Sequence, residues 1–255
     1  MYYYGMDYTY LIFVLPAILL GILAQTWVKS SFSKYNGVIS NKNISGAQAA
    51  QFLLKKNDIN NVKIAHISGN LTDNYNPTNR VLSLSDSTFA SNSIAAIGVA
   101  AHETGHAIQH AKNYFPLKFR RSLVPVANFG SRFGPLFLIA GYVLGANAYS
   151  SASSGGESSV MTIGGIGVFE LLTYLGLILY AAGALFAIVT LPVEFNASRR
   201  ALKILQESHV LDENELNGVR KVLTAAAMTY VASALTAIGN LLRIFVLTQR
   251  RNNRR

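Results

Sequence analysis

The most informative stretch of the sequence is Ala100-Ala101-His102-Glu103-Thr104-Gly105-His106-Ala107-Ile108-Gln109-His110. It lies inside an apolar run that begins at Ile94. On a helix, residues four apart lie on the same face, so His102 and His106 can point their imidazoles at one place. Glu103 lies about 100° round the same helix, within reach of a water held there. Two nitrogen ligands, an open coordination position and a carboxylate base are what a catalytic zinc ion requires. The alternative is two hydrogen-bonded histidines on a buried helix.

The composition is that of a membrane protein. The chain has 255 residues, of which 51% are hydrophobic and 13% charged, and its mean hydropathy is +0.29. So little charge cannot cover the surface of a soluble protein of this size.

The charge pattern indicates which partners to expect. The net charge is +10, and Lys and Arg cluster beside apolar segments and at the C-terminus, which favours a lipid bilayer with anionic headgroups. No nucleic-acid motif or basic stripe with interleaved aromatics is present, so we expect no nucleic-acid partner. Cysteine is absent, which leaves histidine and carboxylates as ligands for any metal.

An N-terminal segment is long and apolar enough to anchor the chain. Residues 8–28 are uncharged, Asp7 precedes them, and Lys29 and Lys34 follow. Because positive charge stays on the cytoplasmic side, we expect an uncleaved anchor whose C-terminal end lies in the cytoplasm.

The region that follows reads as a small soluble domain with helices and strands. Ser45 to Gln48 form a capping-box pattern that opens a helix to about Lys56. Residues 62–68 and 81–85 alternate as strands, separated by the turn-rich segment 73–77. The strand at residues 81–85 is either an edge that binds an extended peptide or a plain core strand.

The helix with the two histidines is expected from about Ser93 to Lys112. Ser91 or Asn92 would cap its N-terminus. Its alanines and glycines permit close packing against neighbouring elements.

Two further apolar segments predict a membrane hairpin. Residues 123–148 form an apolar stretch that Pro125, Arg132 and Pro135 interrupt, and residues 166–191 form the cleanest remaining span. The loop at residues 149–165 contains no Lys or Arg, so we expect it outside the cell, with both ends of the hairpin in the cytoplasm.

The C-terminal region predicts two more helices. One begins near Pro192, and the second begins at the Asp212 to Glu215 capping box and becomes apolar over residues 222–247. If residues 222–247 cross the membrane, four terminal arginines lie outside, against the positive-inside rule. The sequence therefore predicts three or four transmembrane helices.

A catalytic zinc site needs a third protein ligand, and the residues leave several candidates. His110 lies about 80° from His102 on the helix, which makes a shared ion awkward. Glu194 lies at the cytoplasmic end of the hairpin, where the spans would return it to the zinc helix, and Ser198 one turn later could hydrogen-bond it. As an alternative, Glu194 is a helix N-terminal carboxylate favoured by the dipole. Other candidates without a local pattern are His66, His209, Asp73 and Asp86, whereas Glu157 and Glu170 would lie on the outer side.

Three stretches together resemble the YugP-type family of bacterial membrane zinc metallopeptidases. They are residues 100–110, the segment Leu71-Thr72-Asp73-Asn74-Tyr75-Asn76-Pro77, and the segment Leu191-Pro192-Val193-Glu194-Phe195-Asn196-Ala197-Ser198-Arg199-Arg200-Ala201. The order of parts is also similar to the HtpX type of membrane protease. That resemblance implies Glu194 as the third zinc ligand beside His102 and His106. The related motif has Asp where this chain has Ser198.

From these observations we expect a mainly α-helical integral membrane protein with a zincin-like cytoplasmic domain. Its four parts would be an N-terminal anchor (1–29), a cytoplasmic zinc-helix domain with a short β-sheet (30–121), a transmembrane hairpin (122–191) and a C-terminal helical region with the third ligand and a potential fourth span (192–255).

The expected activity is that of a gluzincin-like zinc endopeptidase in the cell membrane, with its active site on the cytoplasmic side. Zn²⁺ would be held by His102, His106 and Glu194, and Glu103 would be the general base that takes a proton from water. Candidates for stabilising the oxyanion are Tyr75, His209 and Arg199. The substrate would be a peptide or protein associated with the membrane, and no pattern indicates an oligomeric state.

Two other classes of function remain open at this level. One is a non-catalytic membrane protein whose metal only holds the domain together. The other is a transporter or channel, which the scarcity of paired charges and broken helices in the clean spans disfavours.

Overall fold

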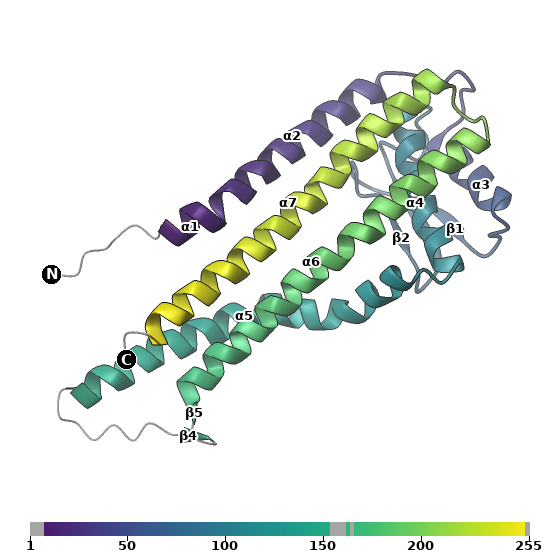
Figure 1. The fold of residues 1–255 in the computed structure, drawn as a ribbon. Helices are drawn as coiled ribbons and strands as arrows, with labels where there is room; N and C mark the ends of the chain where they lie inside the picture. Colours follow the sequence, from purple (N-terminus) through teal and green to yellow (C-terminus); the bar gives the residue numbers. More distant parts are fainter. Residues whose placement is uncertain (1–7, 154–161, 164–165, 253–255) are drawn as a thin grey trace. The chain divides into compact units, whose positions relative to one another are not determined.

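The computed structural model describes residues 8–153, 162–163 and 166–252, and most of them are helical (Figure 1). The helices are α1 (Tyr8–Phe13), α2 (Leu15–Asn36), α3 (Gly46–Lys56), α4 (Ile94–Ala111), α5 (Phe115–Ser153), α6 (Val168–Glu207) and α7 (Glu213–Asn252). The strands are β1 (Lys63–Ile67), β2 (Asn74–Asn76), β3 (Val81–Ser85), β4 (Thr162–Ile163) and β5 (Ile166–Gly167). The prediction of a mainly helical chain with a small sheet is confirmed.

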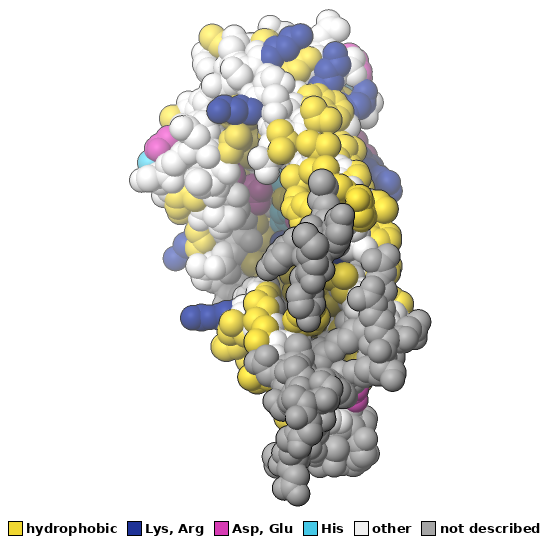
Figure 2. All heavy atoms as spheres, turned by 90° about the vertical axis from the view of Figure 1, so that its left-hand side faces the viewer, with side chains coloured by type: hydrophobic (Ala, Val, Ile, Leu, Met, Phe, Trp, Pro, Cys, Tyr) yellow, Lys and Arg dark blue, Asp and Glu magenta, His cyan; other side chains and the backbone are white. Residues whose placement is uncertain are grey.

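Within the part of the chain that the structure describes, four helical segments are long and apolar enough to cross a membrane by length and composition. They are Tyr8–Asn36, Phe115–Leu144, Val168–Glu207 and Glu213–Gln249. The segment that the sequence left open, within α7, is therefore one of the four. Large apolar side chains on these helices are exposed, among them Ile12, Leu23, Leu136 and Ile178, and Figure 2 shows broad apolar areas on one face. These observations support a membrane location.

Proline does not end the long helices, contrary to the sequence reading. A new helix was expected near Pro192, but α6 runs through that residue without a break, and α5 likewise contains Pro125 and Pro135. A proline removes one backbone hydrogen bond, and the neighbouring turns of a long helix keep theirs, so the helix continues.

The chain forms two compact units, and the four-part division expected from the sequence stays a prediction. Unit 1 comprises Met1–Ile18, Arg120–Ile188 and Ser233–Arg255. Within it, α5 and α6 approach closely through glycines: a Cβ on Gly130 would lie 2.6 Å from the backbone oxygen of Leu179. Most of the loop expected at residues 149–165 lies outside the described residues, although β4 and β5 pair antiparallel.

Unit 2 comprises Leu19–Phe119 and Val189–Ala232 and contains a three-stranded sheet in the order β1-β3-β2. β3 runs parallel to β1 and antiparallel to β2. The segment Asn74–Asn76, which was expected to be only a turn, is therefore an edge strand. β3 is central, with Leu82 and Leu84 fully buried, so the hypothesis that it offers a free edge to a peptide is wrong.

Two capping boxes define the ends of helices around the core of unit 2. Ser45 and Gln48 cap α3 reciprocally, as predicted. Asp212 and Glu215 do the same for α7, with both bonds at 2.8 Å. The cap of α4 is Ser93, not Ser91 or Asn92, because its side chain accepts a hydrogen bond from the backbone of Ala96. These caps fix where each helix starts.

Helix α4 is the centre of unit 2 and is buried on most of its sides. Its buried residues include Ile97, Ala101 and Ile108, which join the core formed with α3, β3 and the adjoining parts of α6 and α7. A Cβ on Gly98 would lie 2.8 Å from a methyl group of Val219 in α7. The short side chains of α4 therefore let larger elements pack close to its axis.

Candidate metal centre

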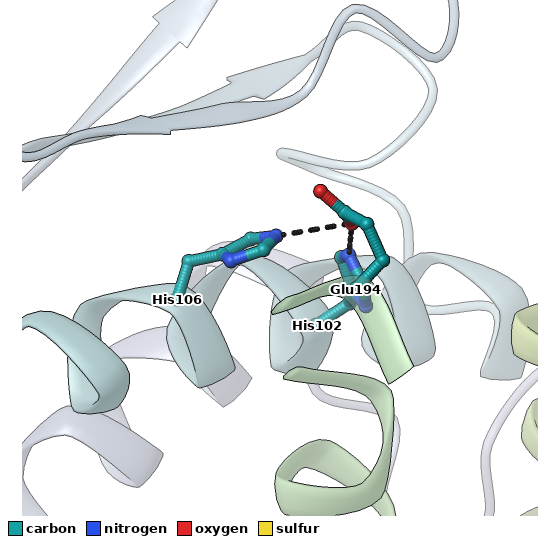
Figure 3. A group of neighbouring side chains, drawn as sticks. All are labelled: His102, His106 and Glu194. Carbon is teal, nitrogen blue, oxygen red and sulfur yellow. Dashed lines mark ion pairs between the residues drawn. The ribbon is translucent and has the colours of Figure 1, made fainter. Parts of the chain in front are cut away.

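Helix α4 and helix α6 bring two histidines and one glutamate to a single point (Figure 3). Oε2 of Glu194 lies 3.3 Å from Nε2 of His102 and 3.4 Å from Nε2 of His106. The three ligand atoms lie within 4.8 Å of one another. The side chain of Glu194 is only 4% exposed, and the two histidines are 13% and 12% exposed. All three residues belong to unit 2, although 88 positions separate His106 from Glu194.

A glycine permits this approach of the two helices. An ideal Cβ on Gly105 would lie 2.6 Å from the backbone oxygen of Ala197, which is too close for any real side chain. Ala101, Ala197 and Ala201 are fully buried and equally small. The space between the backbones is therefore too narrow for a larger residue at position 105.

The second ring nitrogen of each histidine also has a partner. Nδ1 of His102 lies 3.1 Å from the hydroxyl of Ser198, and Nδ1 of His106 lies 3.1 Å from Oε1 of Gln109. Such partners fix the orientation of an imidazole and leave Nε2 to face a metal. Ser198 was expected to hydrogen-bond Glu194; the bond that the structure gives it is to His102 instead, because its side chain faces α4.

Gln109 is the residue of this site that sequence reasoning missed. Its side chain is fully buried, and its amide nitrogen donates to the backbone carbonyl of Val193 at 2.7 Å and to Oδ1 of Asn196 at 3.1 Å. It therefore connects α4 with the turn of α6 that carries Glu194. The sequence does contain one indication of this role: Gln109 lies three residues after His106 and therefore on the same face of the helix.

Glu103 lies in the same buried environment and is 9% exposed. Burial raises the pKa of the Glu103 carboxyl, and the charges of His106 and His102 only partly oppose this effect. Burial by itself would lower the pKa of His106, but the hydrogen bond and charge of Glu194, with the charge of Glu103, raise it overall. The two carboxylates thus favour a positive charge on the imidazole of His106.

The donor set fits a zinc ion. Two imidazole nitrogens and one carboxylate oxygen converge, and each imidazole is oriented by a partner on its other nitrogen. Catalytic zinc sites combine three such protein ligands with a fourth position open to water or substrate. His102, His106 and Glu194 could therefore hold this metal.

The other candidate ligands lie elsewhere. Among the residues that the structure describes, the metal-ligand group contains none of them. The hydroxyl of Tyr75 lies 2.8 Å from Nδ1 of His110, and His66 pairs with Asp86 at 2.6 Å. The amide of Gly69, and then His66, hold the pKa of the Asp86 carboxyl below its usual range.

The remaining residues that the sequence offered for the site also lie outside the metal-ligand group. Asp73 accepts hydrogen bonds from the backbone and hydroxyl of Ser85. His209 lies in the turn after α6 with a φ of 51°, and the side chain of Arg199 is exposed. Glu170 belongs to unit 1, and Glu157 lies outside the described residues.

Comparisons of the sequence identify a family profile and a relative that it resembles. A family profile described as "Putative neutral zinc metallopeptidase" matches residues 10–249. The chain is 40% identical over 238 residues to the "Putative membrane protease YugP" of Bacillus subtilis (strain 168), which covers 93% of this chain and 96% of that protein. No solved structure matches the chain.

The close contact at Gly105 generates a prediction. Gly105→Ala should raise helix propensity, yet we expect it to destabilise the protein by about 1–3 kcal/mol because its Cβ meets the backbone of Ala197. Purified protein should melt at a lower temperature and bind less zinc. Gly183→Ala in α6 is the control, since nothing lies within 4 Å of its Cβ. Equal behaviour of the two variants would contradict the role of the contact.

Proposed function

The chain belongs to the neutral zinc metallopeptidase family, and we propose that it is a membrane-anchored, zinc-dependent endopeptidase. The observation that carries the proposal is the convergence of His102, His106 and Glu194 at one buried point. In this proposal those three residues hold Zn²⁺, as in gluzincin-like peptidases. When bound, zinc would supply Lewis acidity, which lowers the pKa of a water at its open position and polarises a peptide carbonyl.

Glu103 has the role of general base in this proposal. Its neighbours on α4 are the two histidines, and its burial raises the pKa of its carboxyl, which makes the carboxylate a stronger base. Glu103 would take the proton of the attacking water and then give it to the departing amine. The hydrogen bonds of Ser198 and Gln109 would hold the two imidazoles still during these transfers.

The surroundings support a zincin-like domain within unit 2. Helix α4 contacts both β2 and β3, so the histidine helix packs beside a small sheet, and β2 forms one edge of that sheet. Tyr75 of β2 reaches His110, one turn beyond His106, which makes it a better placed candidate for oxyanion stabilisation than the exposed Arg199.

Charge distribution supports an active site on the cytoplasmic side. Lys29 and Lys34 follow the first apolar segment, and Lys118, Arg120 and Arg121 lie near the start of the second. A peptide substrate would then be met at the cytoplasmic face, and a membrane-associated protein is the class that an anchored enzyme reaches most readily.

Replacing the proposed base separates catalysis from metal binding. Glu103→Gln keeps the size of the side chain but cannot accept the proton, so we expect full zinc content and a loss of peptidase activity of at least about 100-fold. Zinc analysis and cleavage of a casein-like substrate by purified protein measure both. Unchanged cleavage would overturn the assignment of Glu103; if the wild type binds zinc without cleaving any substrate, a structural metal site becomes the better interpretation.

Replacing the proposed third ligand tests the metal site. Glu194→Ala should weaken zinc binding by more than about 100-fold, since loss of a ligand should cost more than loss of a supporting hydrogen bond. Competition with a chromophoric chelator measures the affinity. Glu207→Ala, on the same helix and in an exposed ion pair with Lys203, is the control and should bind zinc normally. Normal affinity in Glu194→Ala would place the third ligand elsewhere.

Reporter fusions test the proposed orientation. Fusions after residues 40 and 155 should report the cytoplasm and the outside, respectively, because positive charge flanks the first position and is absent from residues 149–165. A fusion after residue 255 should report the outside if α7 crosses the membrane. An external signal at residue 40 would overturn the cytoplasmic placement.

A further inference from the structure

The buried amide of Gln109 lies between the two halves of the candidate metal centre. Its oxygen faces Nδ1 of His106 on α4, and its nitrogen faces the carbonyl of Val193 and Oδ1 of Asn196 on α6. Val193 directly precedes Glu194. One side chain therefore contacts a proposed ligand on α4 and the backbone next to the proposed ligand on α6.

The chemistry of its partners fixes which way this amide points. A backbone carbonyl can only accept a hydrogen bond, so the group 2.7 Å from the oxygen of Val193 must be the amide NH₂ of Gln109. Asn196 is fixed in the same way, because Oδ1 also accepts from Nε of Arg200 at 2.7 Å, and a guanidinium can only donate. The order of donors and acceptors is thus determined from Arg200 to Gln109.

The orientation of Gln109 determines the tautomer of His106. Since the amide oxygen faces the ring, Nδ1 of His106 must carry a hydrogen in order to donate to it. In the neutral ring the lone pair then lies on Nε2, the atom that faces Glu194. The same does not hold for His102, because the hydroxyl of Ser198 can donate or accept.

The far end of this chain of hydrogen bonds is also anchored. The guanidinium of Arg200 lies over the ring of Tyr114 at 5.8 Å from its centroid, and the hydroxyl of Tyr114 lies 3.5 Å from the carbonyl of Pro192. The segment that carries Glu194 is therefore held by two contacts, one from Gln109 on α4 and one from Tyr114, which follows the end of α4.

We propose that Gln109 is a positioning residue with two separable roles: it holds His106 in the tautomer whose Nε2 can bind a metal, and it keeps the Glu194 segment of α6 in register with α4. This inference rests on the proposed zinc site but not on peptidase activity. The first role uses the amide oxygen, and the second uses the amide nitrogen.

Two substitutions separate these roles. Gln109→Met removes both ends of the amide at nearly constant volume, and we expect zinc affinity to fall by about 10- to 100-fold, the usual effect of losing a partner of a ligating histidine. Gln109→Glu keeps an acceptor for His106 but loses the donor to Val193. It should retain more affinity than Gln109→Met, while the absorption spectrum of the Co²⁺-loaded protein should differ from that of the wild type.

Matched controls distinguish positioning from a loss of stability. Thr104→Val removes a buried hydroxyl on the same helix that bonds only the backbone of Ala100, so it should lower the melting temperature without changing zinc affinity. If Gln109 positions Glu194, then Gln109→Met should cost less affinity in the Glu194→Ala background than in the wild type. Additive losses would contradict the second role.

A metal-free measurement keeps the inference testable by itself. In metal-free Glu194→Ala protein with ¹⁵N-labelled histidine, no carboxylate competes for a hydrogen at Nε2 of His106. At a pH where the imidazoles are neutral, the ring nitrogen shifts should then show Nδ1–H for His106, both with Gln109 kept and with Gln109→Glu. Gln109→Met should lose this preference. An unchanged tautomer and an unchanged zinc affinity in Gln109→Met would overturn the proposal. Failure of the wild type to cleave peptides would count against the peptidase function and leave these readouts intact.

Discussion

The narrow contact between α4 and α6 is the constraint on which the candidate centre depends. The backbone of Ala197 lies where a side chain on Gly105 would have to be, so the two helices meet almost backbone to backbone. At this separation a glutamate side chain from α6 reaches both imidazoles of α4. Any larger residue at the contact would enlarge the gap, and the distance between ligand atoms would grow with it.

Burial and charge act together once the helices are this close. Glu194 and Glu103 place two carboxyl groups beside two imidazoles in a region with little access to water. Removing carboxylates from water is costly unless a positive charge compensates them, and a divalent cation does so more fully than a proton. The hydrogen bonds that the outer ring nitrogens make with the hydroxyl of Ser198 and the amide oxygen of Gln109 leave the inner nitrogens directed at that point.

Short sequence patterns predicted the features whose interacting residues lie close together in the chain. The capping boxes at Ser45 and Asp212 were predicted because their two partners lie three residues apart. The helix that carries His102 and His106 was predicted from the apolar run that surrounds them. Predictions failed where the pairing of elements or the length of a helix decides. β3 became a central strand because β1 and β2 pair with its two edges, and α6 continued through Pro192 because the neighbouring turns keep their hydrogen bonds.

The sequence by itself determined the family, the apolar segments and the two histidines with their glutamate, because spacing on a helix and hydropathy are properties of neighbouring residues. The resemblance to a known family also implied Glu194 as the third ligand. Only the tertiary structure decided that Glu194 reaches the histidines, that Ser198 bonds His102, and that Gln109 joins α4 to α6. The physical reason is that these contacts link residues more than 80 positions apart, and their geometry depends on how closely two helices can pack.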